Sequence, residues 1–200
     1  MHCTGVILAG GGATRFEGRP KGLEVVGGRR IIDRVAAALG TVTDALLLIA
    51  NDPGADAWLP GVRTCGDVRA GEGSLGGLHA ALSHAEAGVL VVAWDMPFVS
   101  APLLQRLRAL GEDGHDAAVA ESGGRRGVEP MCAWYGPGAL EPITQALDRG
   151  DRRATAVLDH LRVARLPLEE VQRFGDPAKL FLNVNSRDEL ARAAQLASAP

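Results

Sequence analysis

Three short apolar runs, separated by segments with helical periodicity, most constrain how this 200-residue chain can fold. The runs are GVILAG (5–10), ALLLIA (45–50) and GVLVVAWDMP (88–97), and the first two carry no charged or amide side chain. Continuous apolar strands of this kind are typical of parallel sheets that are covered by helices on both faces. The alternation therefore predicts an α/β fold with a mainly parallel sheet.

Helical periodicity fills the gaps between these runs and continues through the second half of the chain. Helices are predicted over 30–39, 74–85, 101–110, 138–147 and 153–161. Gly40 is expected to cap the first helix, and Pro102 suits the first turn of the third. Further strands are predicted over 116–121, 130–135 and 181–186. The last leads into a helix whose Ser186 and Glu189 have capping-box spacing. Since no repeat or long linker interrupts the pattern, we expect one domain over 1–200.

Charge and composition exclude several classes of function. A net charge of −3 and scattered basic residues predict no basic patch that would bind nucleic acid or an acidic membrane surface. The start MHCTGVILAG lacks the features of a signal peptide or membrane span, so a cytoplasmic protein is expected. Cys3, Cys65 and Cys132 show no CxxC spacing and are expected to be free thiols in a reducing compartment.

Three consecutive glycines (10–12) directly follow the first predicted strand, and the nearby Lys21 is one of two lysines against nineteen arginines. Glycines let backbone N–H groups approach phosphate oxygens closely. The sequence matches neither the P-loop nor the dinucleotide-binding template. A compact ammonium can sit between two phosphates, whereas the planar arginine fork needs more room. The stretch therefore favours a phosphate site, with a plain turn and a solvated lysine as the alternative.

Asp95 stands near the end of the strongest predicted strand, just before Met96 and Pro97. Ligands of α/β proteins bind at the carboxyl ends of parallel strands. Magnesium prefers oxygen ligands and commonly takes one or two carboxylates together with substrate phosphates. Asp95 is therefore a candidate metal ligand. A carboxylate that only caps the turn before proline is the alternative.

Six motifs carry a resemblance along nearly the whole chain. They are LAGGGATRFEGRPKGL (8–23), CGDVRAGEGSLGGLHAAL (65–82), WDMPFV (94–99), EPMCAWY (129–135), DRRATAVLD (151–159) and FLNVNSRDEL (181–190). In this order they resemble the molybdenum cofactor guanylyltransferase family of GT-A-like nucleotidyltransferases. The resemblance implies a single-domain, Rossmann-like three-layer α/β/α sandwich. It also implies a nucleotide-binding half (1–100) and an acceptor or pterin half (101–200).

The resemblance assigns nucleotide and metal roles to residues that match the motifs. The residues expected at the nucleotide are Leu8, Ala9, Gly10, Gly11, Lys21, Asn51, Asp67 and Asp95. Arg15, Lys21 and Asp95 are expected to act in catalysis, the first two on the phosphates. Asp95 is also the implied ligand of Mg²⁺, for which Mn²⁺ could substitute. For Asp67, a loop aspartate in an Asx turn is the alternative.

The same resemblance places the pterin near the end of the chain. Asn183 and Asn185 occupy alternate positions and would share one face of a strand. The family implicates this element in binding the pterin, and hydrogen bonding at the end of a strand is the alternative. Arg153, like Arg152 beside it, could meet the pterin phosphate or merely begin a solvated helix.

Two positions depart from the family's usual pattern. Pro20 stands before the lysine where the family usually has aspartate, and Trp94 stands before the metal aspartate where the family usually has cysteine. Proline stiffens the loop, and tryptophan is expected to add bulk beside the metal. Neither change removes a charge that the chemistry needs.

The implied activity is the transfer of GMP from GTP to the terminal phosphate of Mo-molybdopterin, with release of pyrophosphate. The implied protein partners are a molybdenum-insertion protein and an apo-molybdoenzyme or its chaperone. Cytidylyl transfer to the same cofactor and nucleotidyl transfer to another small phosphate stay open. A non-catalytic cofactor carrier is a further alternative, although a carrier would not need Lys21 and Asp95 together.

Overall fold

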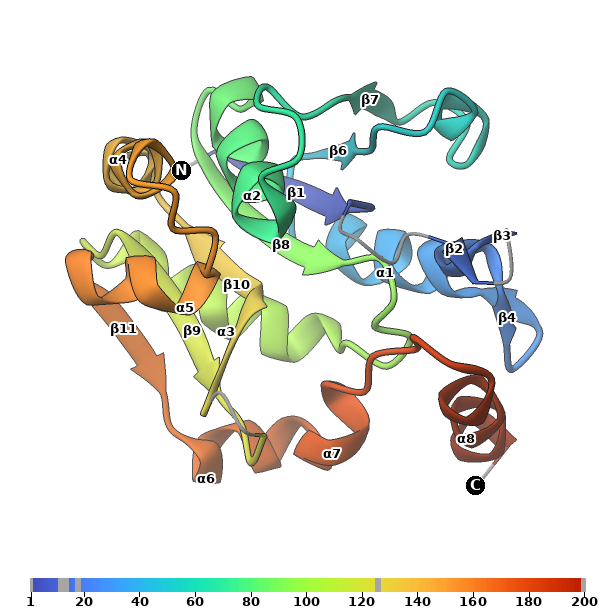
Figure 1. Cartoon of the computed structure of the whole chain (residues 1–200). Coiled ribbons are helices and arrows are strands. Elements are labelled where there is room, and N and C mark those ends of the chain that lie inside the picture. The colour runs from blue at the N-terminus through green and yellow to red at the C-terminus, as the bar shows by residue number, and fades with distance from the viewer. Residues whose placement is uncertain (1, 11–14, 17–18, 125–126, 199–200) are drawn as a thin grey trace.

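A single central sheet of seven strands organises the molecule (Figure 1). The computed structural model describes residues 2–10, 15–16, 19–124 and 127–198, with the backbone alone at residues 15, 16 and 19. The strands are β1 (Cys3–Leu8), β6 (Ala45–Ile49), β7 (Arg63–Cys65), β8 (Gly88–Ala93), β9 (Ala117–Glu121), β10 (Val128–Tyr135) and β11 (Val163–Leu166). Their order in the sheet is β11-β9-β10-β8-β1-β6-β7. Every neighbouring pair is parallel except the two that β10 forms with β8 and β9. The mainly parallel sheet expected from the apolar runs is confirmed.

Helices cover both faces of this sheet, which makes three layers (Figure 1). The helices are α1 (Ile31–Gly40), α2 (Gly73–His84), α3 (Ala101–Glu112), α4 (Leu140–Asp148), α5 (Ala154–Val157), α6 (Leu168–Val171), α7 (Pro177–Leu180) and α8 (Arg187–Ser198). One face packs against α1 and α3, and the opposite face packs against α2, α4 and α5. Two short hairpins precede α1: β2 (Arg15–Phe16) with β3 (Arg19–Pro20), and β4 (Val25–Val26) with β5 (Arg29–Arg30).

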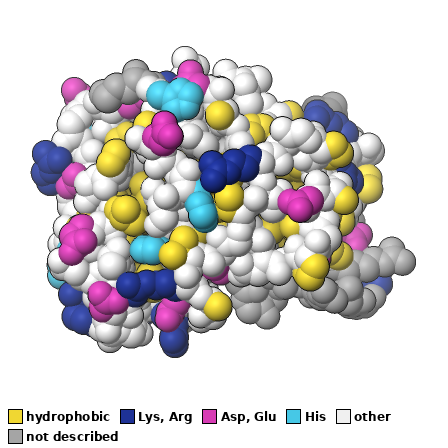
Figure 2. Space-filling view, turned by 90° about the horizontal axis from the view of Figure 1, so that it is seen from above, with side chains coloured by type: hydrophobic (Ala, Val, Ile, Leu, Met, Phe, Trp, Pro, Cys, Tyr) yellow, Lys and Arg dark blue, Asp and Glu magenta, His cyan; other side chains and the backbone are white. Residues whose placement is uncertain are grey.

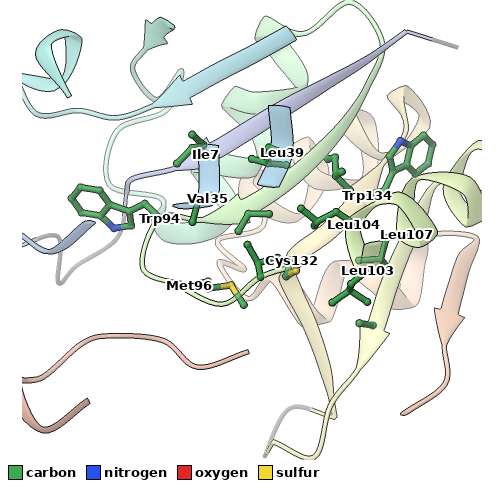
Figure 3. Packing of buried hydrophobic residues seen from close by; sticks show 14 of the residues in the cluster. Ile7, Val35, Leu39, Trp94, Met96, Leu103, Leu104, Leu107, Cys132 and Trp134 are labelled. Atoms are coloured by element: carbon green, nitrogen blue, oxygen red, sulfur yellow. The ribbon is translucent and has the colours of Figure 1, made fainter. Parts of the chain in front are cut away.

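The strand period of two divides the core between the two faces. Along β1, Ile7 belongs to the cluster under α1 and α3, whereas Val6 and Leu8 belong to the cluster under α2 and α4. Figure 3 shows the first cluster, with Trp94 at one end and Trp134 at the other. Because both faces are covered, the central strands need apolar side chains at every position, which explains their uninterrupted runs.

The end of the chain returns to the carboxyl edge of the sheet (Figure 1). After α7, residues 181–186 form an irregular segment, in which the Val184 N–H donates a hydrogen bond to the Asp95 carbonyl at 2.9 Å. Leu182 and Val184 pack in a small cluster with Val26 of β4 and Ala193 of α8. The predicted helix start is confirmed, because the Glu189 N–H donates to Ser186 Oγ at 3.2 Å.

Three predictions about individual elements are wrong. Residues 181–186 form no strand, because their backbone pairs with the turn after β8 and not with a sheet neighbour. The strand predicted to reach residue 97 ends at Ala93, where the Met96 N–H turns back to the Ala93 carbonyl at 3.3 Å. Gly40 is the last residue of α1 and lacks a positive φ, so Thr41 is the C-cap instead.

The three cysteines are free thiols, as predicted, with Cys3 and Cys132 buried. Within the described part of the chain, every helix is too short or too polar to cross a bilayer. Figure 2 shows acidic, basic and histidine side chains interspersed over one face of the molecule. An anionic ligand must therefore find its attraction in the local charges of a site.

Candidate active site

A cavity of about 380 Å³ opens at the carboxyl ends of β1, β6 and β8. Its walls are formed by Leu8, Gly10, Ile49, Gly73, Ser74, Gly77, Ala93, Asp95, Met96, Glu129, Met131, Asn183 and Asn185. Because β10 runs antiparallel to β8, its first residues reach the same edge at which the parallel strands end. The lining therefore draws on residues from both sides of position 100, and the assignment of the two halves to two substrates stays a prediction.

Lys21 lies in a single 3₁₀ turn directly after the β2–β3 hairpin, and its side chain contacts two of the residues that line this cavity. Its Nζ donates to Asp95 Oδ2 at 2.5 Å and to Asn185 Oδ1 at 2.6 Å. Lys21 is 9% exposed and Asp95 6% exposed, so the ion pair is buried. The fold thus brings together three predicted site residues that are far apart in the sequence. A single ammonium satisfies two acceptors here, in a space that suits lysine better than the larger arginine fork.

Asp95 occupies the turn that follows β8. The Trp94 N–H still donates to the Leu8 carbonyl at 3.1 Å, which continues the pairing with β1 by one residue. Lys21 engages Oδ2, while Oδ1 is buried and has no hydrogen-bond partner among the described atoms. A buried carboxylate oxygen on a cavity wall is an available ligand for a hard cation. No three His, Cys, Asp or Glu residues of the described chain gather around one metal position, so substrate and water would have to complete the coordination.

Two glycines of the cavity wall leave room beside the backbone. Among the described residues, a β-carbon at Gly10 would meet nothing within 4 Å, and one at Gly77 would come to 3.7 Å from Leu8 Cδ2. Leu8 and Gly10 line the cavity. Ala9 instead points into the opposite core cluster, and its N–H donates to the Ile49 carbonyl at 2.9 Å. Gly11 lies outside the described residues.

Asn51 and Asp67 form a reciprocal pair beside the cavity. Asn51 Nδ2 donates to Asp67 Oδ2 at 2.7 Å, and the Asp67 N–H donates to Asn51 Oδ1 at 2.8 Å. Asp67 Oδ1 has no partner among the described atoms and would lie 3.9 Å from a β-carbon at Gly77. The structure therefore brings these two predicted residues together, with one carboxylate oxygen directed toward a cavity-lining glycine.

The position of Arg15 is described for its backbone alone. In the β2–β3 hairpin Arg15 is the register partner of Pro20, so it faces the residue that precedes Lys21. The hairpin thus brings the backbones of two predicted catalytic residues close together. The interaction of the Arg15 guanidinium with phosphate stays a prediction.

The two predicted pterin asparagines both line the cavity, although no strand holds them. Asn185 accepts from Lys21, and its own N–H donates to Glu189 Oε2 at 2.7 Å. Asn183 Nδ2 donates to the Phe181 carbonyl at 3.0 Å. The irregular segment thus presents both side chains to the cavity without the strand that the sequence predicted.

Arg153 does not line this cavity. Its guanidinium is exposed and pairs with Asp151, with Nη2 to Oδ2 at 2.9 Å. The neighbouring Arg153 guanidinium lowers the pKa of the Asp151 carboxyl to about 2. Arg152 likewise pairs with Glu72, at 2.6 Å. A part for Arg153 in pterin binding stays a prediction.

Residues on β10 line the cavity and were not predicted as site residues. Glu129 and Met131 lie at alternate positions and face it together. The signal was present in the motif EPMCAWY, but a sequence does not state the direction of a strand. Only the antiparallel course of β10 brings its amino-terminal end, and so this carboxylate, to the edge where Asp95 lies.

The expectation that Trp94 adds bulk beside the metal is wrong. Trp94 is buried in the cluster on the α1 face and does not line the cavity. Trp94 packs in that cluster whereas Asp95 lines the cavity, so these two neighbouring side chains diverge in the turn after β8. The indole stacks on Trp58, with ring centroids 5.1 Å apart.

Known proteins are similar to this chain in sequence and in fold. Residues 5–165 match the MobA-like NTP transferase domain. A molybdenum cofactor guanylyltransferase of Desulfosudis oleivorans is 34% identical over 193 residues, which cover 95% of this chain and 93% of that protein. Another from Vibrio campbellii is 32% identical over 199 residues, which cover 96% of this chain and 95% of that protein. Molybdopterin-guanine dinucleotide biosynthesis protein A from Archaeoglobus fulgidus has a similar crystal structure, with a TM-score of 0.81 and 29% identity over 98% of each chain. These matches confirm the resemblance and the nucleotidyltransferase fold: the chain belongs to the MobA-like NTP transferase family.

Proposed function

We propose that this chain is a molybdenum cofactor guanylyltransferase, which transfers GMP from GTP to the terminal phosphate of Mo-molybdopterin. The observation that carries the proposal is the contact of Lys21 with Asp95 and Asn185 on one cavity wall. It joins a cation, a carboxylate and an amide from both halves of the chain. Two relatives named as such enzymes, 34% and 32% identical over almost their whole lengths, support the same substrates.

In the proposed reaction, an oxygen of the molybdopterin phosphate attacks the α-phosphorus of GTP. The bond from that phosphorus to the oxygen bridging to the β-phosphate breaks, and pyrophosphate leaves. A phosphate nucleophile is anionic near neutral pH, so the protein does not need to remove a proton. Its tasks are alignment and neutralisation of charge. Lys21 suits the second task, because two acceptors hold its ammonium in place before any phosphate arrives.

A divalent cation fits the carboxylate of Asp95. Oδ2 is held by Lys21, and the buried Oδ1 is free of hydrogen bonds among the described atoms. Bound Mg²⁺, or Mn²⁺ in its place, would neutralise negative charge on the nucleotide phosphates. Asp95 is the residue that would hold it. The ion pair with Lys21 fixes the carboxylate of a residue that lines the cavity.

The two substrates are proposed to bind on different sides of Asp95. GTP would lie against Leu8, Gly10 and Gly77, where the backbone is open, with Asp67 and Asn51 nearby. Molybdopterin would lie along the wall that contains Asn183 and Asn185, whose amides can hydrogen-bond a pterin.

The proposal is tested first by ligand-induced thermal stabilisation, with GTP, CTP, ATP and UTP, each with and without Mg²⁺. A ligand at a hundredfold excess over its Kd adds about 2.7 kcal/mol to the free energy of unfolding. We expect GTP with Mg²⁺ to stabilise most, and we expect pyrophosphate release once Mo-molybdopterin is added. A preference for CTP would overturn the choice of base. Stabilisation by molybdopterin without any nucleotide response would favour a cofactor carrier.

We also propose that the protein works in the cytoplasm. Its free thiols support a reducing compartment. The expected protein partners are a molybdenum-insertion protein and an apo-molybdoenzyme or its chaperone. Co-purification of such a partner with the tagged protein from cells that make molybdoenzymes would test that expectation.

A further inference from the structure

Two stacked tryptophans lie beneath the turn that carries Lys21, and the chemistry above makes no use of them. The ring centroids of Trp58 and Trp94 are 5.1 Å apart and the ring planes differ by 19°. Trp94 is 1% exposed and Trp58 is 7% exposed, and neither ring lines the cavity. Direct contact with a substrate is therefore not their role.

Gly22 lies directly against the Trp94 ring. A β-carbon at Gly22 would lie 2.4 Å from Trp94 Cε3 and 2.7 Å from Cδ2, far inside an ordinary contact. Gly22 is not one of the glycines with a positive φ, so its backbone conformation is open to other residues. The indole, and not the backbone conformation, is what requires glycine here.

The two acceptors of Lys21 make its position sensitive to this contact. Lys21 directly precedes Gly22, and its Nζ reaches Asp95 at 2.5 Å and Asn185 at 2.6 Å. Trp94 directly precedes Asp95. The ring that supports the turn and the carboxylate that receives the ammonium therefore belong to the same short segment, and any displacement of Gly22 from the ring also displaces Lys21 from Asp95.

We propose that the Trp58–Trp94 stack is a positioning platform, which holds Lys21 at its two acceptors through the close fit of Gly22. Trp58 stacks on the Trp94 ring, and Gly22 lies against the same ring. The consequence for turnover rests on the proposed function, whereas the consequence for Lys21 itself does not. The platform acts through Lys21, so both tryptophans are positioning residues.

The kinetic test is a double-mutant cycle of Gly22→Ala and Trp94→Cys. To reach an ordinary contact of 3.4 Å from 2.4 Å, the alanine methyl must move the turn by about 1 Å. A displacement of that size at a charge-stabilising group costs roughly 10²-fold in rate. We expect Gly22→Ala to lower kcat by about that factor in the parent protein and to have almost no effect in the Trp94→Cys background, where the ring is gone. Equal losses in both backgrounds would overturn the proposal.

A matched control separates this contact from a general effect of alanine. Gly123 also lacks a positive φ, and a β-carbon there would meet no described atom within 4 Å. Gly123→Ala is expected to leave kcat unchanged. A protein that merely unfolds would lose near-UV circular dichroism of its tryptophans. Gly22→Ala should instead retain folded structure while kcat falls.

A second readout needs neither GTP nor molybdopterin. The chain has only two lysines, so Lys179 is an internal reference for amine acylation followed by mass spectrometry. Lys21 is 9% exposed and held by two acceptors, which should make it react slowly in the parent protein. We expect the ratio of Lys21 to Lys179 labelling to rise severalfold in Gly22→Ala and to stay at the parent value in Gly123→Ala.

The two readouts distinguish the possible failures. If the parent protein does not join GTP to molybdopterin, the proposed function is wrong, and the labelling ratio alone decides the inference. Removal of a buried indole destabilises a core, so the single Gly22→Ala variant also decides it if Trp94→Cys does not fold. An unchanged labelling ratio in Gly22→Ala would show that the indole does not position Lys21.

Discussion

The two walls of the cavity are built in different ways. The nucleotide-side wall, Leu8, Gly10 and Gly77, comes from the end of β1, the glycine turn and α2, and it offers backbone and a single apolar side chain. The acceptor-side wall is formed by Glu129, Met131, Asn183 and Asn185, and it offers three polar side chains and one thioether. Those residues come from the antiparallel strand and from an irregular segment near the end of the chain.

This difference implies two modes of recognition. A wall of backbone and glycine selects a ligand by shape and by peptide hydrogen bonds. A wall of amides and a carboxylate selects by side-chain hydrogen bonds. Asp95 also lines the cavity, and Lys21 joins it to the acceptor-side wall, because Asp95 and Asn185 share the same ammonium. Substitutions should therefore affect GTP alone, molybdopterin alone, or both, according to their place.

The largest effect on turnover is expected at Lys21, which contacts both Asp95 and Asn185. Lys21→Ala removes the ammonium held between the two acceptors, and we expect kcat to fall on the order of 10²–10³-fold. Lys21→Arg is the matched variant, and it should restore little, because a planar guanidinium cannot occupy the same position. Steady-state pyrophosphate release measures both. Near-normal turnover in Lys21→Ala would remove Lys21 from the catalytic residues.

A methyl group on the nucleotide-side wall should affect only GTP. At Gly77 a β-carbon would stand at ordinary contact distances of 3.7 and 3.9 Å, so Gly77→Ala should fold normally while it narrows the cavity. We expect the KM for GTP to rise about tenfold or more, with the KM for molybdopterin unchanged. Gly40→Ala, whose β-carbon would lie 3.8 Å from Leu46, is the control away from the cavity. Equal changes in both KM values would contradict the division into two walls.

A truncation on the acceptor-side wall should have the opposite pattern. Asn183→Ala removes one amide from the cavity, and a lost hydrogen bond of this kind costs roughly 0.5–1.5 kcal/mol. The KM for molybdopterin should rise roughly two- to tenfold, while GTP binding, followed by thermal shift, stays the same. A loss of GTP binding would show that the nucleotide contacts the acceptor-side wall, which would contradict the proposed division.

The smallest expected effect is on the free energy of unfolding at acidic pH. His79 lies on α2, the helix of the nucleotide-side wall, and burial together with the charge of Arg69 lowers its pKa below the ordinary 6.5. The unfolded chain therefore binds a proton more readily than the folded protein. The free energy of unfolding should be steady above about pH 6.5 and should fall as the pH drops below it. His79→Gln should flatten this slope in chemical denaturation, and an unchanged slope would count against a buried neutral His79.

Elements with a clear local period could be predicted from the sequence. The central strands β1, β6 and β8 and the helices α1 to α3 agree with their apolar patterns to within a few residues. Lys21 and Asp95 were recognisable too, because each follows a structural signal, a glycine turn or a strand end. The course of residues 181–186 could not be predicted in the same way. Alternating residues occur in segments of many kinds, whether or not a sheet neighbour pairs with them.

Sequence alone determined the layered α/β fold, the carboxyl edge as the place of the candidate site, and the charges predicted for it. Tertiary structure decided which of those residues meet. It joined Lys21 to both Asp95 and Asn185, turned Trp94 to the opposite face, brought Glu129 to the cavity and left Arg153 outside it. The physical reason is the separation along the chain of the residues that each property involves. Hydrophobic periodicity is a property of neighbouring residues, whereas a site depends on strand direction and on contacts between segments that are distant in the chain.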